Sequence, residues 1–485
     1  MRTGCVWHGV RTVTASLAAA AVALAQEPAS PTAVDLLQRE VTAMERELQA
    51  LRDMVGGAPP MSSRQYVAGL GAPFEVQEPQ APEPGPSKLT QRPERWHLLP
   101  KQDVGWSLTG WLSFGGALNA ASPDDRYNGP VTFPDRSNQF TLYEAHASLE
   151  NHRIFGGDGW SLGARVDLFY GSNARFLTAA GLESTWNGPG AYGLAMPFAN
   201  LELKTGDVTT LLGHFVSPVG YFIVGSANNF FNVLPYTFEY GEPFTHTGFW
   251  SSWQVDAELA IGGGVIGGWD SFADWDSASA GLVDNAWNRH VGALLTASKT
   301  NLLTRRDAFS YVGVWSQEPD LTALGRSSRY LQTLVYNVQL TDAVTWVAQT
   351  DFGWQADAVP AASGRANDAE WFGINQYLTW QLDPEWSVGM NLEWFRDNDG
   401  FRVVGAEPSF GSPRATSFGR GPFQGDFYRV MAGAQWSPHP NLMVRPALVF
   451  DAFDGRATGA ANGLPFDDGT ARTQLLAIVD VLVFF

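Results

Sequence analysis

The 485-residue sequence has one cysteine, few charged residues (16%) and no long apolar run. Because that cysteine, Cys5, lies close to the N-terminus, no disulfide can stabilise the rest of the chain. The longest purely apolar stretch, residues 17–25, falls short of the roughly 20 residues that a membrane-spanning helix needs, so a helical membrane protein is excluded. The net charge of −18 argues against a nucleic-acid partner, because nucleic-acid binding needs a basic face.

The N-terminal segment has the features of an export signal. Arg2 and Arg11 give it a positive start, residues 17–25 form a short apolar core, and Ala23-Leu-Ala25 is a small-residue cleavage motif. We predict a signal peptide over residues 1–25; the alternative is a buried or amphipathic N-terminal helix. Cys5 precedes the apolar core, so it is not a lipoprotein-type cleavage cysteine.

Residues 26–57 carry a heptad pattern. Apolar residues recur at alternating spacings of three and four, which predicts a coiled-coil helix whose seam needs partner chains. We expect self-association as a homotrimer, although the seam does not choose between two and three strands, and a single helix packed on the following domain is the alternative. The seam consists of Val34, Leu37, Val41, Met44, Leu48, Leu51 and Val55. A proline-rich linker over residues 58–103 follows.

From residue 104 to residue 485 the pattern changes to strict alternation. Trp386, Met390 and Trp394, for example, share one face of a segment whose other face carries Asn391 and Glu393. Sixteen such segments can be counted, joined alternately by tight turns and by long Gly/Pro/Asp-rich connections, and aromatic residues cluster near their ends. These features predict an all-β fold, a transmembrane antiparallel β-barrel of about 16 strands with both termini in the periplasm.

Four segments resemble a known family. They are Asn128-Gly-Pro-Val-Thr-Phe-Pro-Asp-Arg136, Arg165-Val-Asp-Leu-Phe-Tyr-Gly-Ser-Asn-Ala-Arg175, Ser217-Pro-Val-Gly-Tyr221 and Gly241-Glu-Pro-Phe-Thr-His-Thr-Gly248. Together they resemble the OmpL-like β-barrel porin family, and the similarity extends over most of residues 105–485. The resemblance implies a pore in the bacterial outer membrane without specifying a solute. The terminal aromatic Phe485 resembles the signal by which the barrel-assembly machinery recognises outer-membrane barrels.

Motifs that could carry enzyme chemistry lack the required context. Gly159-Trp-Ser-Leu-Gly163 matches a nucleophile elbow, but Ser161 begins a predicted strand instead of a strand–turn–helix. No predicted helix follows the glycines of residues 262–267 to hold a pyrophosphate. The eight histidines show no metal-ligand spacing, so we expect no enzyme, cofactor or metal site. Acidic loop residues could bind calcium, although solvated loops are the commoner explanation; they are Asp270, Asp274, Asp276, Asp467 and Asp468.

Polar residues on the non-lipid face of the strands are the candidate functional residues. We expect these to line the pore: Glu144, His146, Arg165, Asp167, Gln349, Asp351, Asn391, Glu393, Arg429 and Arg445. The alternative is that oppositely charged residues on this face only stabilise the barrel wall and do not contact a permeating solute. The long connection over residues 216–245 is expected to fold inward as a constriction, or else to pack against a neighbouring subunit. Its candidate residues are Tyr221, Phe230, Phe231, Tyr236, Glu239 and Glu242.

The sequence therefore favours an outer-membrane diffusion porin, mildly selective for cations. Sixteen strands can enclose a water-filled channel for small hydrophilic solutes and ions, and acidic loops concentrate cations. The alternative is a barrel-anchored structural tether whose periplasmic N-terminal segment grips the cell wall. The expected partners are outer-membrane lipid, the barrel-assembly machinery and further copies of the chain.

Overall fold

The computed structural model describes Trp96 and most, but not all, of residues 105–485. The described residues are Trp96 and residues 105–183, 186–187, 190–272, 291–319, 326–360, 366–404, 420–461 and 463–485. All of them belong to the second of the two units into which the chain divides, Pro60–Phe485. The predicted signal peptide (1–25), the coiled-coil helix (26–57) and, apart from Trp96, the linker (58–103) lie outside the described residues.

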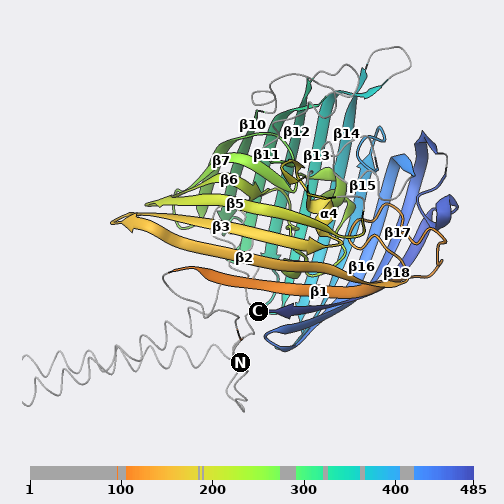
Figure 1. The fold of residues 1–485 in the computed structure, drawn as a ribbon, viewed down its shortest axis with the longest axis horizontal. Helices are drawn as coiled ribbons and strands as arrows, with labels where there is room; N and C mark the ends of the chain where they lie inside the picture. Colours follow the sequence, from red (N-terminus) through yellow and green to blue (C-terminus); the bar gives the residue numbers. More distant parts are fainter. Residues whose placement is uncertain are drawn as a thin grey trace, which may run out of the picture. The chain divides into compact units, whose positions relative to one another are not determined.

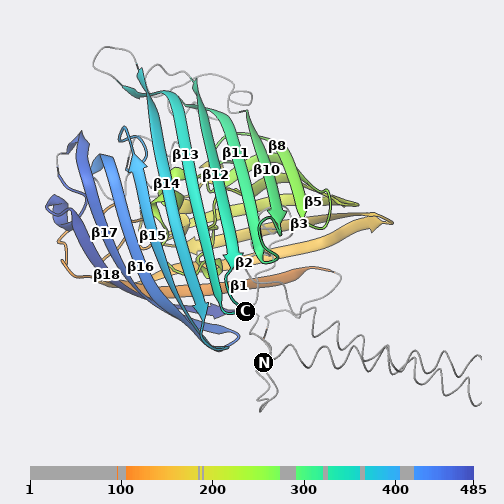
Figure 2. The same cartoon turned by 180° about the vertical axis from the view of Figure 1, so that it is seen from behind.

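Sixteen of the described strands form one closed barrel (Figures 1 and 2). Each strand pairs antiparallel with the next barrel strand in the chain, and β1 closes the ring by pairing with β18. The barrel strands are β1 (Ser107–Asn119), β2 (Gln139–Gly157), β3 (Trp160–Gly171), β5 (Gly193–Thr205), β6 (Val208–Val216), β7 (Thr245–Gln254), β8 (Leu259–Ile266), β10 (Gly292–Thr300), β11 (Asp307–Pro319), β12 (Arg326–Gln339), β13 (Val344–Pro360), β14 (Ala366–Gln381), β15 (Trp386–Asp397), β16 (Gly421–His439), β17 (Leu442–Ala461) and β18 (Thr473–Phe484). The prediction of a barrel of about sixteen antiparallel strands is confirmed.

The two faces of the wall differ as the alternation predicts. On β3, Val166 and Leu168 are exposed on the outer face, whereas Asp167 is buried on the inner face. The same holds on β15, where Met390 and Leu392 are exposed outside. Because successive side chains of a strand point to opposite faces, this pattern gives the wall an apolar outside and a polar or packed inside.

The connections fall into two groups at opposite ends of the barrel. Those that follow β2, β5, β7, β10, β12, β14 and β16 contain two to six residues, and we call this the short-turn end. The longest ones lie at the other, long-loop end. Both ends of the barrel sequence lie at the short-turn end, where the backbone N–H and C=O of Phe485 each hydrogen-bond Gly110 at 3.0 and 2.9 Å.

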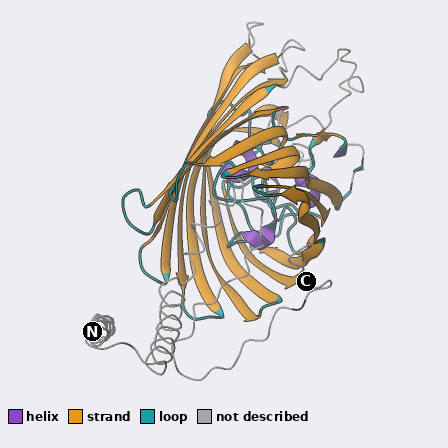
Figure 3. Ribbon diagram, turned by 90° about the vertical axis from the view of Figure 1, so that its left-hand side faces the viewer, coloured by secondary structure: helices purple, strands orange, loops and turns teal. Residues whose placement is uncertain are grey.

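The long connections carry the remaining short elements. These are α4 (Ala174–Leu177), the helical turns η2 (Ser226–Asn228), η3 (Thr237–Gly241) and η7 (Asp467–Gly469), and a small parallel sheet of β4 (Ala180–Gly181) and β9 (Ser271–Phe272). Within the residues that the structure describes, no helix is both long and apolar enough to cross a membrane. Figure 3 shows helical turns and loops lying inside the curve of the strands.

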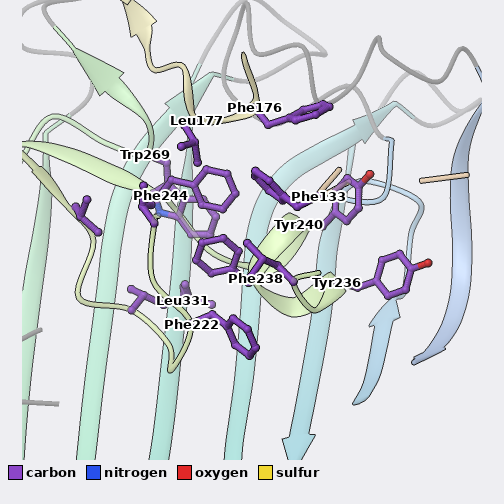
Figure 4. Packing of buried hydrophobic residues seen from close by; sticks show 14 of the residues in the cluster. Phe133, Phe176, Leu177, Phe222, Tyr236, Phe238, Tyr240, Phe244, Trp269 and Leu331 are labelled. Carbon is purple, nitrogen blue, oxygen red and sulfur yellow. The ribbon is translucent and has the colours of Figure 1, made fainter. Parts of the chain in front are cut away.

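Aromatic side chains fill the space that these loops enter. The rings of Phe238 and Phe244 stack with centroids 4.6 Å apart, and Phe133 lies 6.1 Å from Phe244. Figure 4 shows this group together with Trp269 and Phe222 in front of the strand wall. All five side chains are buried in one continuous cluster. The barrel thus has an apolar core on its inside, built from loops that fold inward against the wall.

Candidate functional site

The connection between β6 and β7, residues 217–244, crosses the interior of the barrel. In the ring of sixteen strands, β6 and β7 lie opposite β15 and β16. The backbone N–H of Tyr221 nevertheless donates to Gln349 of β13 at 2.9 Å, and Gln435 of β16 donates to the carbonyl of Phe230 at 2.9 Å. We call residues 217–244 the inner loop, because they reach the far wall from the inside.

Two wall carboxylates hold the N-terminal ends of the helical turns in the inner loop. Glu144 of β2 accepts the backbone N–H of Ser226 at 3.0 Å and its hydroxyl at 2.9 Å, at the start of η2. Glu393 of β15 accepts the N–H groups of Tyr236 and Thr237 at 2.8 and 2.7 Å, at the start of η3. The first N–H groups of a helix have no partner within it, so a carboxylate at that point satisfies them.

Wall donors hold the carbonyl groups of the same loop. Arg445 of β17 donates to the carbonyls of Ser226 and Asn229 at 2.7 and 2.8 Å. Arg429 of β16 donates to the carbonyl of Leu234. Trp371 Nε1 of β14 donates to the carbonyl of Gly241 at 3.0 Å, at the end of η3.

The charges of these two arginines are neutralised within the wall. Arg445 pairs with Asp480 at 2.6 Å, and Arg429 pairs with Asp451 at 2.7 Å and lies 3.6 Å from Glu239 of the inner loop. All of these charged side chains are at most 2% exposed. Buried ions of opposite charge require such pairing, because an unpaired charge would lose its hydration without compensation.

Amide and carboxyl groups form the next contact along the wall. Gln349 Nε2 donates to Glu242 of the inner loop at 2.6 Å and to Asp351 at 2.8 Å. A Cβ on Gly220, which has φ +80°, would lie 2.3 Å from the Glu242 carboxylate, so a larger residue would strain the backbone and displace that carboxylate. Asn391 is farther from the loop: it donates to Asn375 at 3.3 Å, and Asn375 donates to Thr237 at 2.8 Å.

Some apolar residues of the inner loop pack on the inner faces of β16, β17 and β18, whereas Phe222, Phe238 and Phe244 belong to the aromatic cluster described above. Phe231 and Val233 belong to a buried cluster with wall residues, and Phe230 packs against it. The wall members include Met431, Val449, Leu476 and Ile478. Side chains of the inner loop therefore fill the part of the barrel interior that lies next to β16–β18.

The wall of β2, β3 and β5 carries a separate polar group. Arg165 makes a two-pronged contact with Asp167, at 2.8 Å from Nε and 2.6 Å from Nη2, and its guanidinium lies over the ring of Phe198. His146 Nε2 and the hydroxyl of Ser148 also contact Asp167, at 3.1 and 2.6 Å. These contacts run within the wall, and the Arg165 side chain keeps 12% of its surface exposed.

The ten predicted wall residues face the interior, and seven of them show two kinds of contact. Glu144, Gln349, Glu393, Arg429 and Arg445 contact the inner loop directly, whereas Arg165 and His146 do not depend on it for the contacts described above. Sequence reasoning missed Trp371 and also Arg402, whose guanidinium donates to the carbonyl of Tyr240 at 2.6 Å.

Arg402 lies in a second connection that folds inward. Asp397, at the end of β15, accepts the backbone N–H groups of Phe401, Arg402 and Val403 at 3.0, 2.7 and 2.8 Å. The carboxylate thereby turns the chain so that Phe401 and Val403 become buried. The sequence signal was the apolar pair that flanks an arginine in an otherwise polar loop.

The motifs set aside as unsuited to catalysis lie in strands. Ser161 is in β3, and Gly262–Gly264 are in β8. Asp270 accepts the N–H groups of Phe244 and Thr245, so it braces the inner loop. Asp468 similarly accepts two backbone N–H groups of the β1–β2 loop. Among the residues in the described ranges, no group of three or more His, Cys, Asp or Glu side chains could hold a metal ion; Asp274 and Asp276 lie outside those ranges.

The fold is similar to those of solved bacterial outer-membrane proteins. The anion-selective porin from Comamonas acidovorans has a TM-score of 0.49 and 11% identity, over 79% of this chain and 99% of that one. A loop L8 deletion mutant of OmpT, an outer membrane protein of Vibrio cholerae, has a TM-score of 0.47 and 10% identity, over 79% and 99% of the two chains. No curated protein sequence matches the chain.

A family match covers the barrel from end to end. The sequence profile of the family described as "Putative beta-barrel porin-2, OmpL-like" matches residues 105–485. This range begins just before β1 and ends at the last residue of the chain. It includes the inner loop and every wall residue described above. The chain therefore belongs to this OmpL-like family of β-barrel porins.

Proposed function

We propose that the chain forms a narrow outer-membrane channel for small hydrophilic solutes and ions. The observation that carries the proposal is the inner loop, which occupies the interior next to β16–β18 and is fixed there by wall charges. The passage then runs along the polar wall of β2, β3 and β5, where Arg165 and Asp167 face the interior. Family membership supports a porin-type channel.

We further propose weak cation selectivity. The chain has an excess of acidic over basic residues, with a net charge of −18. The three wall arginines that could favour anions, Arg165, Arg429 and Arg445, each pair with a carboxylate. Because paired arginines add little net positive field, the acidic loops dominate the potential at the mouth.

Planar-bilayer recording tests both parts of the proposal. The purified protein should give discrete conductance steps, and a tenfold KCl gradient should give a reversal potential of the cation-selective sign that decreases as total salt rises. An anion-selective sign that is abolished by Arg165→Ala would show that the wall arginine overrides the net charge. Folded protein that gives no conductance but binds cell-wall material would favour the tether instead.

The remaining assignments concern the segments around the barrel. We propose that residues 1–25 are removed on export, that residues 26–57 form a periplasmic coiled coil that holds a homotrimer together, and that residues 58–103 link it to the barrel. Phe485 would serve the barrel-assembly machinery as its recognition residue. Its backbone pairing with Gly110 at the β1–β18 closure supports a role in the last step of barrel formation.

A further inference from the structure

A histidine lies between two carboxylates on the inner wall at the short-turn end. His152 of β2 has Nε2 3.8 Å from Glu150 and Nδ1 3.9 Å from Glu202 of β5. Its side chain is 47% exposed, whereas the two glutamates are about nine-tenths buried. The imidazole is therefore open to water while it faces fixed negative groups on both sides.

The missing side chain of Gly163 creates the place for this histidine. On β3, Gly163 is paired with Glu202 of β5, and β2 is irregular between Asn151 and Phe155 where it passes Gly163. A Cβ on Gly163 would lie 2.6 Å from the carbonyl oxygen of Asn151 and 2.9 Å from the Cα of His152. The glycine thus lets β2 approach β3 closely, and the imidazole reaches across β3 toward Glu202.

The charged groups around the imidazole nearly balance. On the parts of the inner faces of β2, β3 and β5 that lie near this imidazole, three carboxylates face two permanent cations, which gives −1 when the imidazoles are neutral. Protonation of His152 brings this sum to zero. The groups are Glu150, Asp167 and Glu202 against Arg165 and Lys204, and the second imidazole, His146, hydrogen-bonds Asp167.

The geometry fits a proton better than a metal ion. A metal ion shared between the imidazole and the carboxylates would bind one ring nitrogen, but here each nitrogen faces a different carboxylate. Only the protonated imidazole has an N–H donor on both nitrogens. Imidazole is the side chain whose positive charge depends on protonation, whereas the charges of arginine and lysine are permanent near neutral pH.

We propose that His152 is a selectivity-determining residue of the channel and lowers its preference for cations when it becomes protonated. The inference rests on the proposed channel function and assigns the control of its ion selectivity to one residue. In water, one unit charge about 6 Å from a permeating ion changes the local ion concentration about threefold. The effect should weaken at high salt because mobile ions screen it.

The test measures the ratio of potassium to chloride permeability from reversal potentials at pH 8 and pH 5. The wild-type ratio should fall roughly tenfold on acidification at low salt, because the local potassium concentration falls about threefold while the local chloride concentration rises about threefold. His152→Gln should keep the pH 8 value at both pH values, and His152→Arg, which is always charged, should keep the pH 5 value at both. Glu202→Gln removes one of the two carboxylates but leaves His152 in place, and it should lower the permeability ratio at pH 8.

His439→Ala is the matched control, because His439, the last residue of β16, lies at the same end of the barrel, where its ring accepts the N–H of Asn441. This variant should keep the full response to pH. A conducting His152→Gln channel that responds to pH like the wild type would overturn the inference while leaving the channel function intact. Absence of any conductance from folded wild-type protein would instead overturn the proposed function and the inference with it.

Discussion

Removal of the Glu393 carboxylate should release the inner loop from the wall without opening the barrel. Glu393 accepts two backbone N–H groups and one hydroxyl of the loop, at 2.8, 2.7 and 2.7 Å. In Glu393→Ala these three buried donors lose their acceptor, at about 1–3 kcal/mol each. Even the lower limit, about 3 kcal/mol in total, raises the population of the released loop by roughly a hundredfold.

Two measurements on Glu393→Ala report on the loop. Single-channel current should become larger or noisier than in the wild type, and a protease should cleave within residues 217–244 in folded protein. Glu385→Ala is the matched control, because Glu385 is an exposed glutamate in the turn before the same strand. If Glu393→Ala shows wild-type current and resists the protease as the wild type does, then the wall carboxylate does not hold the loop.

Three other predictions concern assembly, acidity and association. Phe485→Asp should reduce the heat-modifiable folded form in the outer membrane, because Phe485 pairs with Gly110 where β18 meets β1; normal amounts of that form would contradict this. Burial raises the pKa of Glu183, in the loop before β5, from 4.5 to about 7. The folded loop therefore binds the proton more tightly than the unfolded chain, and its stabilisation, complete below pH 4.5, is lost as the pH rises to about 7. Limited proteolysis should accelerate over that window in the wild type but not in Glu183→Gln, and protection that increases with pH would refute this. Polar substitutions in the coiled-coil seam should lower the mass of crosslinked oligomers while the barrel still folds, and an unchanged mass would show that the barrel wall holds the subunits together; the residues to change are Leu37, Met44, Leu48 and Leu51.

The barrel was predictable because alternation along a strand is a local property. Leu392 and Glu393 must point to opposite sides of any strand that contains both, so the sequence alone separates the outer face from the inner one. The alternation of tight turns with long connections then orders the strands around the ring. Neither step needs a contact between distant residues. Together they were enough to predict sixteen strands.

The contacts of the inner face were not predictable in the same way. Glu393 meets Thr237 across 156 residues, and Arg445 meets Ser226 across 219. Such pairs depend on where a long loop folds, which a periodic pattern does not encode. Gly163 shows the same limit: the sequence placed it correctly in a strand and not in a nucleophile elbow, but did not predict that the glycine allows the close approach of two strands.

The inner wall therefore carries two sets of charges whose effects on a current can be separated. Glu144, Glu393 and Arg445 are occupied by the backbone of the inner loop. Changing one of them should alter the size and steadiness of the current, because it alters how firmly the loop is held. On β3, Arg165 pairs with Asp167, and on β2, His152 faces Glu150 and Glu202. Changing either residue should alter the permeability ratio of cations to anions. The noise of the single-channel current should stay as in the wild type, because the inner loop stays in place. A variant of Arg165 that loosens the loop, or a variant of Glu393 that alters only selectivity, would show that the two sets are not separate.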